Sequence, residues 1–252
     1  MTKAFTQATG IPVNLDDNST GPLLTQIEAS KNNPNWGLLW VDGATAFAGL
    51  DTQGLLLKGF EPGVTWNSLG TQLLPSDKSY TPTGVTLMAA LAYDKNKVKN
   101  PPTTWQQLLE PQWKGQVGMN DPSQSGPTFP FIAGMMNYLG GGAALGDKNI
   151  GISHLHPVTL LPSAIGIDAK APAAEQAEAE KFIEFVLSPA GQQVMQSADP
   201  TGDSLYYPVL QGVSPLSSLP SLASTTTQTI NPYTWGPQEG TINTWFDANI
   251  VR

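Results

Sequence analysis

Trp36-Gly37-Leu38-Leu39-Trp40-Val41-Asp42-Gly43 is a short apolar run with turn residues on both sides. Such a run is typical of a buried strand. It ends at an aromatic residue, a carboxylate and a glycine, and in an open α/β sheet ligands sit where strands end. This strand end offers an indole face, a carboxylate and close backbone access but no obvious nucleophile. It therefore suits holding a small molecule better than transforming one.

Strand-like and helix-like segments alternate along the rest of the chain, so we expect an α/β fold. The expected strands are 11–15, 38–41, 84–93, 116–119, 150–152 and 163–167. The expected helices are 4–10, 23–32, 44–50, 105–109 after a cap at Thr103 or Thr104, 129–139, 173–187 and 245–251. We detect no internal repeat.

The composition narrows the class of partner. A chain of 252 residues, 40% of them hydrophobic, is long enough for one large domain or two small ones. Its formal net charge of −8 argues against nucleic acid, because phosphate binding needs clustered cations. No apolar run reaches the roughly 18 residues of a membrane span, so we expect a protein that is not embedded in a membrane. Met1-Thr2-Lys3 leads directly into polar sequence, without a visible signal peptide.

Two residue counts restrict the chemistry. The chain has no cysteine, which excludes thiol catalysis and disulfides. Its 12 basic residues comprise lysines and a single arginine, Arg252, at the end of the sequence. A bidentate arginine clamp is a common way to hold a carboxylate or phosphonate. If an anion binds here, backbone N–H groups at helix starts, hydroxyl groups or a lysine must hold it.

A series of motifs follows a fixed order along the chain: Phe5…Thr9-Gly10-Ile11-Pro12-Val13, Trp40-Val41-Asp42, Gly54-Leu55-Leu56, Tyr93-Asp94-Lys95-Asn96, Pro102-Thr103-Thr104-Trp105-Gln106-Gln107-Leu108-Leu109, Pro111-Gln112-Trp113-Lys114-Gly115, Asp121-Pro122-Ser123, and Phe182-Ile183-Glu184-Phe185-Val186-Leu187-Ser188-Pro189-Ala190-Gly191-Gln192. In order and spacing they resemble family 1 of the bacterial extracellular solute-binding proteins, the periplasmic receptors of ABC importers. The most similar branch serves ferric iron, 2-aminoethylphosphonate and small amino acids such as 4-aminobutyrate.

The resemblance implies a type II periplasmic binding protein fold, with two lobes and a ligand cleft between them. We expect residues 1–88 and 165–205 to form lobe 1, and residues 89–164 and 206–252 to form lobe 2. The implied protein is a periplasmic receptor that is not an enzyme, has no cofactor, and passes its ligand to an ABC transporter permease. We expect its ligand to be a small zwitterionic amino compound of the 4-aminobutyrate or 2-aminoethylphosphonate type, captured by lobe closure.

Three alternatives stay open. One is a receptor for ferric iron or another metal, with oxygen ligands from Tyr206, Tyr207 and Asp42 together with His154. Another is an enzyme, although the chain has no Gly-x-Ser-x-Gly elbow and no known phosphate-binding glycine loop. The last is a shortened scaffold without ligand binding, because the first strand of the family and a mid-chain segment at 140–144 are missing from the pattern. An unpaired sheet edge would then favour self-association.

Two loops at expected helix starts are candidates for anion binding. Ser123, Ser125, Gly126 and Thr128 lie between a strand and a helix, where backbone amides and hydroxyl groups can hold an anion. Ser19, Thr20 and Gly21 form the equivalent loop of lobe 1. The other interpretation of both loops is ordinary helix capping. A ligand between two helix N-termini would be a carboxylate or phosphonate.

The remaining candidates would contact a cationic or aliphatic part of a ligand. Asp42, followed by Gly43, and Asp121 are each either a partner for an ammonium group or a helix cap. Trp40 either stacks on the ligand or is packed in the core. The weaker candidates lie at expected lobe edges and are Tyr80, Thr83, Thr86, Tyr206 and Tyr207. His154 and His156 have metal-like spacing but no third ligand nearby, so we expect a solvated or hydrogen-bonded pair and no metal site.

Overall fold

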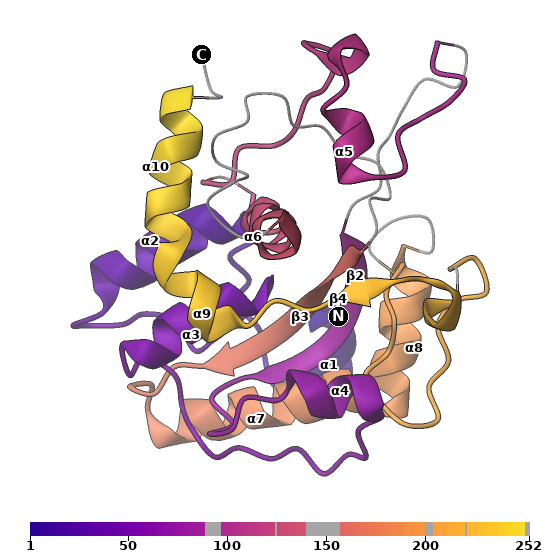
Figure 1. Cartoon of the computed structure of the whole chain (residues 1–252). Helices are drawn as coiled ribbons and strands as arrows, with labels where there is room; N and C mark the ends of the chain where they lie inside the picture. Colours follow the sequence, from indigo (N-terminus) through magenta and orange to yellow (C-terminus); the bar gives the residue numbers. More distant parts are fainter. Residues whose placement is uncertain (89–96, 124, 140–156, 200–203, 220, 250–252) are drawn as a thin grey trace. The chain divides into compact units, whose positions relative to one another are not determined.

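The computed structural model describes residues 1–88, 97–123, 125–139, 157–199, 204–219 and 221–249 (Figure 1). The expected α/β fold is confirmed, since helices alternate along the chain with the strands of a mixed sheet. The chain forms two compact units. Unit 1 comprises Met1–Thr86 and Pro162–Leu219, and unit 2 comprises Leu87–Leu161 and Pro220–Arg252. The motif at 93–96, the join at 140–144, the expected strand 150–152 and the histidine pair lie outside the described residues.

Unit 1 contains the longer elements of the N-terminal half and the paired helices that follow β3. Its elements are α1 (Thr2–Thr9), α2 (Thr20–Ser30), β1 (Leu38–Asp42), α3 (Ala44–Thr52), α4 (Ser68–Leu73), most of β2 (Thr81–Met88), the second half of β3 (Val158–Ile167), α7 (Ala173–Leu187) and α8 (Pro189–Ala198). The strand order is β1-β3-β2. β1 is antiparallel to β3, with Leu38 opposite Ile167 and Asp42 opposite Ser163.

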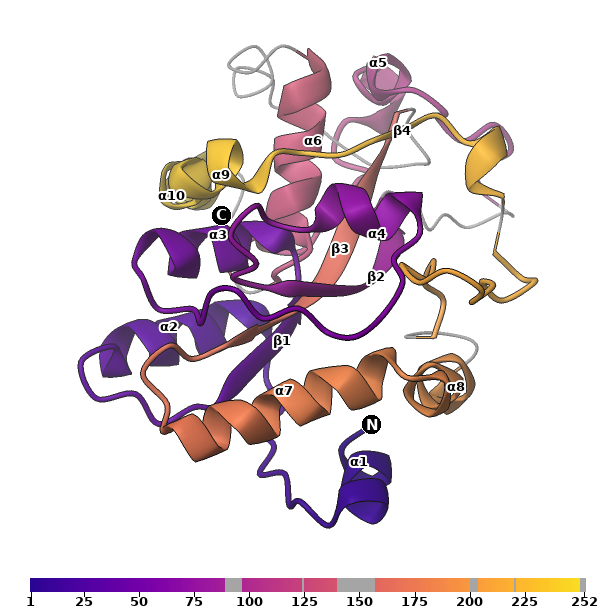
Figure 2. The same cartoon turned by 90° about the horizontal axis from the view of Figure 1, so that it is seen from below.

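The alternation of side chains along β1 explains how its two faces are covered. Leu39 and Val41 belong to a buried cluster that includes Phe47 of α3. Trp40 points to the other face, where its ring makes a T-shaped contact with Phe182 of α7 at a centroid distance of 6.0 Å. Figure 2 shows α7 and α3 on opposite sides of β1. Successive residues of a strand face opposite sides of a sheet, so this short run supplies both hydrophobic layers of unit 1.

The N-terminal segment is part of the same core. Phe5 of α1 is buried and packs edge-on against Phe182, with ring centroids 5.0 Å apart. The helix ends at Gly10, whose φ of 76° is the left-handed conformation that glycine adopts freely. The strand predicted at 11–15 is wrong, because this segment is irregular. A strand requires a hydrogen-bonded neighbour, and the described residues supply none for it.

The segment after α8 is attached to unit 1. Tyr207 forms an antiparallel bridge with Val85 of β2. The Asn67 side chain donates to the carbonyl of Pro208 at 2.8 Å and accepts from the N–H of Gly70 at 2.9 Å. These contacts place residues 206–219 in unit 1, whereas the sequence-based boundary assigned them to lobe 2.

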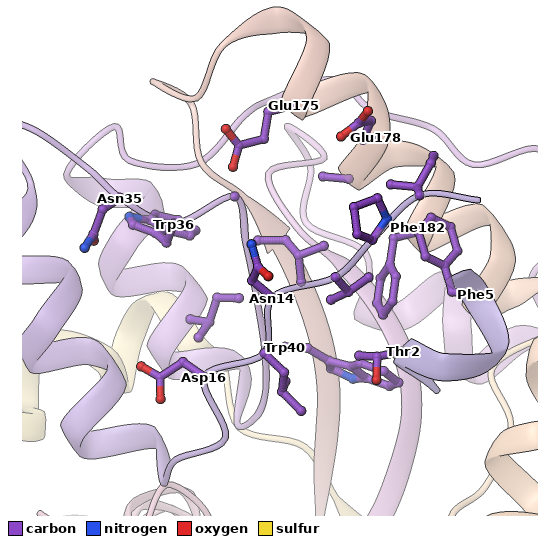
Figure 3. A pocket seen from close by; sticks show the side chains of 18 of the residues that line it. Thr2, Phe5, Asn14, Asp16, Asn35, Trp36, Trp40, Glu175, Glu178 and Phe182 are labelled. Atoms are coloured by element: carbon purple, nitrogen blue, oxygen red, sulfur yellow. The ribbon is translucent and has the colours of Figure 1, made fainter. Parts of the chain in front are cut away.

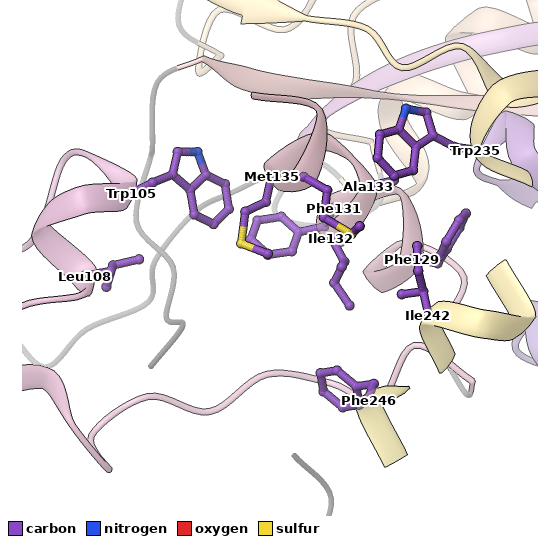
Figure 4. Close-up of a cluster of buried hydrophobic side chains, with 11 residues drawn as sticks. Trp105, Leu108, Phe129, Phe131, Ile132, Ala133, Met135, Trp235, Ile242 and Phe246 are labelled. Carbon is purple, nitrogen blue, oxygen red and sulfur yellow. The ribbon is translucent and has the colours of Figure 1, made fainter. Parts of the chain in front are cut away.

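Unit 2 is built around one buried helix. Its elements are α5 (Trp105–Leu108), η1 (Pro111–Trp113), α6 (Thr128–Leu139), the first half of β3, η3 (Leu222–Ser224), β4 (Thr227–Gln228), α9 (Pro232–Trp235), η4 (Gly236–Gln238) and α10 (Glu239–Asn249). Figure 4 shows the cluster that α6 forms with Trp105 and Leu108 of α5, Trp235 of α9, and Ile242 and Phe246 of α10. The predicted cap of α5 is confirmed, because Thr104 Oγ1 accepts from the Gln107 N–H at 3.2 Å.

Several predicted boundaries differ from the structure. The strand predicted at 116–119 is irregular. α2 begins three residues before the predicted 23, β3 begins at 158 where 163 was predicted, and α10 begins at 239 where 245 was predicted. The early part of β3 carries threonine and proline within its apolar run, and these residues obscured the period of the strand. No described helix is both long and apolar enough to cross a membrane.

Candidate functional site

The polar groups at the end of β1 form the first candidate site. The indole N–H of Trp40 lies 3.2 Å from Thr83 Oγ1 and 3.1 Å from Ser163 Oγ, so β1, β2 and β3 all contribute to one hydrogen-bonded group. Asp42 is half-buried and lies opposite Ser163 in the register. Sequence reasoning missed Ser163. The feature that could have identified it is a serine inside the otherwise largely apolar run 158–167.

The turn after β1 brings the backbone to the same place. Gly43 has a φ of 100°, which permits the chain to turn directly from β1 into α3, and it is the N-cap residue of that helix. Its N–H donates to the carbonyl of Pro162 at 2.8 Å. The carboxylate of Asp42 is therefore held beside the start of α3, on a backbone that is tied to β3.

The loop before α2 is a separate part of unit 1. Ser19 is the N-cap residue, but its side chain makes no capping hydrogen bond, and its N–H donates to Asn18 Oδ1 at 2.9 Å. Thr20 is buried, whereas Gly21 is half-buried. Side-chain capping by Ser19 is thus not seen. The structure does not join this loop to the group around Trp40 through any hydrogen bond between the residues it describes.

The two tyrosines are packed in unit 1. Tyr206 is 4% exposed, and its hydroxyl donates to Gln192 Oε1 at 3.2 Å. Burial raises the pKa of Tyr206 to about 12 and also raises the pKa of Tyr207. Both phenols therefore stay protonated at neutral pH. Thr86 is half-buried near the end of β2.

The candidates of unit 2 form one compact turn before α6. Asp121 Oδ1 accepts from the N–H of Ser123 at 2.8 Å and from its hydroxyl at 2.7 Å. The N–H of Ser125 donates to the carbonyl of Asp121, and the N–H of Thr128 donates to the carbonyl of Ser125, each at 3.0 Å. Thr128 is buried, and Gly126 is half-buried. Asp121 therefore shapes this turn.

The two groups of candidates differ in chemistry. Unit 1 presents a half-buried carboxylate beside an indole and two hydroxyl groups, whereas unit 2 presents hydroxyl and amide groups where α6 begins. Within the described ranges, no three His, Cys, Asp or Glu side chains are placed to hold a metal ion. Both arrangements are suited to holding polar ligand groups.

We expect Trp40→Phe to lower the free energy of unfolding by about 1–3 kcal/mol. The change removes the indole N–H, which is a hydrogen-bond donor to the hydroxyl groups of Thr83 and Ser163. Thr83 is fully buried, so the lost hydrogen bond is not replaced by one to bulk water. Urea denaturation of the purified chain measures the effect. Trp36→Phe is the matched control, because it removes the same atoms without affecting Thr83 or Ser163. Equal losses in the two variants would show that the hydrogen bonds contribute nothing.

Comparison with known proteins identifies the family. The sequence profile of the bacterial extracellular solute-binding proteins matches residues 1–153, which is more than half of the chain. The chain therefore belongs to the bacterial extracellular solute-binding protein family. No curated protein matches its sequence significantly.

Solved structures of binding proteins share the fold. Iron-bound HitA from Pseudomonas aeruginosa is 18% identical with a TM-score of 0.77, over 96% of this chain and 93% of that one. AfuA from Actinobacillus pleuropneumoniae, with fructose-6-phosphate bound, is 17% identical with a TM-score of 0.78, over 99% and 93%. A periplasmic thiamin binding protein is 19% identical with a TM-score of 0.73, over 100% and 90%. The type II periplasmic binding protein fold is thereby confirmed.

Proposed function

We propose that this protein is the periplasmic receptor of an ABC importer and binds a small zwitterionic amino compound of the 4-aminobutyrate or 2-aminoethylphosphonate type. Membership of the solute-binding family supports the receptor role. The observation that carries the ligand class is the half-buried carboxylate of Asp42, at the strand end beside Trp40. The proposed mode of capture is lobe closure, in which contacts from the second lobe shift the population toward a closed state. The receptor then delivers the ligand to its permease.

The ammonium group of the ligand would pair with Asp42. A carboxylate withdrawn from water interacts more strongly with a cation than an exposed one does, because the local dielectric is lower. The neighbouring indole of Trp40 adds an aromatic surface of the kind that attracts cations. Gly43, which is buried and bonded to Pro162 through its N–H, fixes the backbone that carries this carboxylate.

The acidic group of the ligand would bind without arginine. Arg252 is the only arginine in the chain, so a guanidinium clamp is not available from the rest of the sequence. The turn before α6, a 12-residue helix, contains the hydroxyl of Ser125 and the backbone N–H of Gly126, whereas the N–H groups of Ser123 and Ser125 are bonded to Asp121. A helix N-terminus favours negative charge. We propose this turn, together with the hydroxyl of Ser19, for the carboxylate or phosphonate.

Ferric iron is the second candidate, and two solved structures with the same fold contain iron. The protonated state of the two tyrosines argues against ferric iron as the ligand. A phenol must lose its proton to bind ferric iron, and burial raises the pKa of Tyr206 to about 12. Its hydroxyl is also engaged with Gln192. We therefore rank iron below an amino compound as ligand.

Calorimetric titration with 4-aminobutyrate, 2-aminoethylphosphonate and ferric citrate tests the proposal. We expect saturable binding of one of the two amino compounds. Asp42→Asn should weaken it roughly 10- to 100-fold, since a hydrogen bond to a charged group contributes about 1.5–3 kcal/mol. Asp17→Asn removes the same charge from an exposed position of unit 1 and should leave the affinity unchanged.

Three other results would contradict the proposal. Binding of ferric citrate alone, with a charge-transfer colour, would identify a metal receptor. Full affinity of Asp42→Asn for the amino compound would remove Asp42 from the site. A cooperative unfolding transition that none of the ligands shifts would identify a folded scaffold without solute binding, because a ligand that binds only the folded state must raise the melting temperature.

A further inference from the structure

Asp42 of β1 and Ser163 of β3 face one another across the sheet of unit 1. The N–H of Gly43 donates to the Pro162 carbonyl at 2.8 Å, which makes Gly43 and Pro162 a hydrogen-bonded pair. Hydrogen-bonded and non-hydrogen-bonded pairs alternate along antiparallel strands, so the adjacent pair, Asp42 and Ser163, is of the second kind. In such a pair the Cα atoms are about 4.5 Å apart and the side chains approach most closely. The serine side chain is therefore the nearest cross-strand neighbour of the carboxylate.

The indole of Trp40 holds the hydroxyl of Ser163 from the same face of the sheet. Residues two apart in a strand share a face, so Trp40 and Asp42 point to the same side. The indole N–H donates to Ser163 Oγ at 3.1 Å. Figure 3 shows this indole and the ring of Phe182 side by side in the wall of a pocket of unit 1. Packing of the indole fixes the direction of its N–H and, through the hydrogen bond, the position of the serine oxygen.

The hydroxyl of Ser163 retains hydrogen-bonding capacity. A serine hydroxyl offers one donor and two acceptor positions, whereas an indole N–H is a donor only. In the part of the chain that the structure describes, the bond from Trp40 is the only one to this hydroxyl, so its proton and its second acceptor position remain. Thr83 Oγ1 shares the same indole N–H at 3.2 Å but is fully buried, whereas Ser163 is half-buried. Ser163 is therefore the hydroxyl of this group that a ligand can reach.

The charge beside Ser163 decides which end of a ligand this hydroxyl meets. The carboxylate of Asp42 is directly opposite, and like charges placed directly opposite one another in a sheet are destabilising, so an acidic ligand group is disfavoured here. A primary ammonium group is complementary, because it has three N–H donors and no acceptor. Asp42 accepts one N–H, and the second acceptor position of Ser163 accepts another. An N–H that is withdrawn from water without an acceptor would weaken the complex.

We propose that Ser163 is the residue by which this site selects a primary ammonium group over a methylated one. The assignment rests on the proposed function, because it takes Asp42 as the partner of the ligand's positive charge. A trimethylated ammonium group has the same charge but no N–H, so Asp42 and the indole of Trp40 attract it whereas Ser163 contributes nothing. Selectivity is a difference between two affinities. The hydroxyl of Ser163 raises only one of them.

Calorimetry on the whole chain compares 4-aminobutyrate and 2-aminoethylphosphonate with their N-trimethylated derivatives. We expect the primary amine to bind more tightly than its trimethylated form. Ser163→Ala should weaken the primary amine about tenfold and change the trimethylated form less than about twofold, because only the primary amine loses a hydrogen bond to a charged group. Ser163→Thr keeps a hydroxyl and should restore the preference. A variant with a distorted strand end would weaken both forms alike, so the ratio of the two affinities separates selection from a structural role.

Two features protect this comparison from folding defects. In Ser163→Ala the indole N–H of Trp40 retains Thr83 as an acceptor. Ser79→Ala is the matched control, because it removes the same atom from a buried position of unit 1 that is not part of the candidate site. It should leave the ratio of the two affinities unchanged. An equal loss of both forms in Ser163→Ala, or an unchanged ratio, would overturn the proposal.

A titration with small ions separates this proposal from the identity of the solute. Methylammonium and tetramethylammonium are added in turn to the isotope-labelled chain, and the indole N–H resonance of Trp40 is followed. We expect methylammonium to shift this resonance at a lower concentration than tetramethylammonium, and the two midpoints to coincide in Ser163→Ala. That result without binding of either amino compound would refute the proposed solute and support the role of Ser163. Coinciding midpoints in the unmodified chain, or no response of the resonance to methylammonium, would refute the role of Ser163 whichever solute binds.

Discussion

Gly191→Ala is expected to lower the free energy of unfolding by about 3 kcal/mol or more, which is a large effect for one methyl group. A Cβ atom at this position would lie 2.0 Å from the carbonyl oxygen of Phe185 and 2.7 Å from that of Val186. Both neighbours are backbone atoms near the end of α7, so no side-chain rotation relieves the contact. The N–H of Gly191 also donates to Ser188 Oγ, the cap of α8, which fixes the glycine at the junction of the two helices.

Chemical denaturation of the variant and the unmodified chain measures this loss. The matched control is Gly49→Ala, because Gly49 lies within α3 and has nothing within 4 Å of a built Cβ atom. Alanine is the better helix former by about 1 kcal/mol, so this control should be as stable as the unmodified chain or more stable. A Gly191→Ala variant as stable as Gly49→Ala would show that α7 and α8 can separate at no cost.

Glu239→Gln is expected to stabilise the protein by roughly 3 kcal/mol at pH 8 and by almost nothing at pH 4. Burial raises the pKa of Glu239 from 4.5 to about 7 in the folded chain. Well below pH 4.5 the carboxyl group is protonated in both the folded and the unfolded chain, so its burial does not lower the free energy of unfolding. Between pH 4.5 and 7 the unfolded chain releases its proton first, so stability falls as the pH rises. Above pH 7 the carboxylate is charged in both states, and the loss of stability has reached its full size. A glutamine at this position carries no charge, so the variant does not have this loss.

Urea unfolding of both chains at pH 4, 6 and 8 tests this sign. The difference between Glu239→Gln and the unmodified chain should grow from pH 4 to pH 8. Glu184→Gln, an exposed residue of α7, controls for the removal of one negative charge from an acidic protein. A constant difference across the three pH values would mean that the Glu239 carboxyl group is well solvated in the folded chain.

Local signals predicted the helices and strands whose ends are marked in the sequence. α7 has the predicted bounds of 173–187, Gly10 is the C-cap residue of α1, and Thr104 caps α5. Each of these depends on residues close together in sequence. The apolar run at 38–41 also gave β1 correctly, because buried strands of that length need few further signals.

Partners distant in sequence explain the failures. The segments 11–15 and 116–119 have strand-like sequences but no paired strand among the described residues, and a strand is stable only beside another. The same reason explains why only part of the candidate site was predicted from the sequence. Trp40 and Asp42 were identifiable at a strand end, whereas Ser163 became visible only once the register had placed it opposite Asp42. Whether these residues contact a ligand is still a prediction.

The pairing of β1 with β3 has a consequence for the synthesis of this protein. The paired residues are 121 positions apart for Asp42 and Ser163, and 129 apart for Leu38 and Ile167. A ribosome adds roughly 5–20 residues per second, so β1 is exposed for many seconds before its partner has been made. During that time an apolar strand with two open edges is available to any neighbouring nascent chain. We expect unit 1 to form late in translation, and chaperones that hold extended segments to increase its yield.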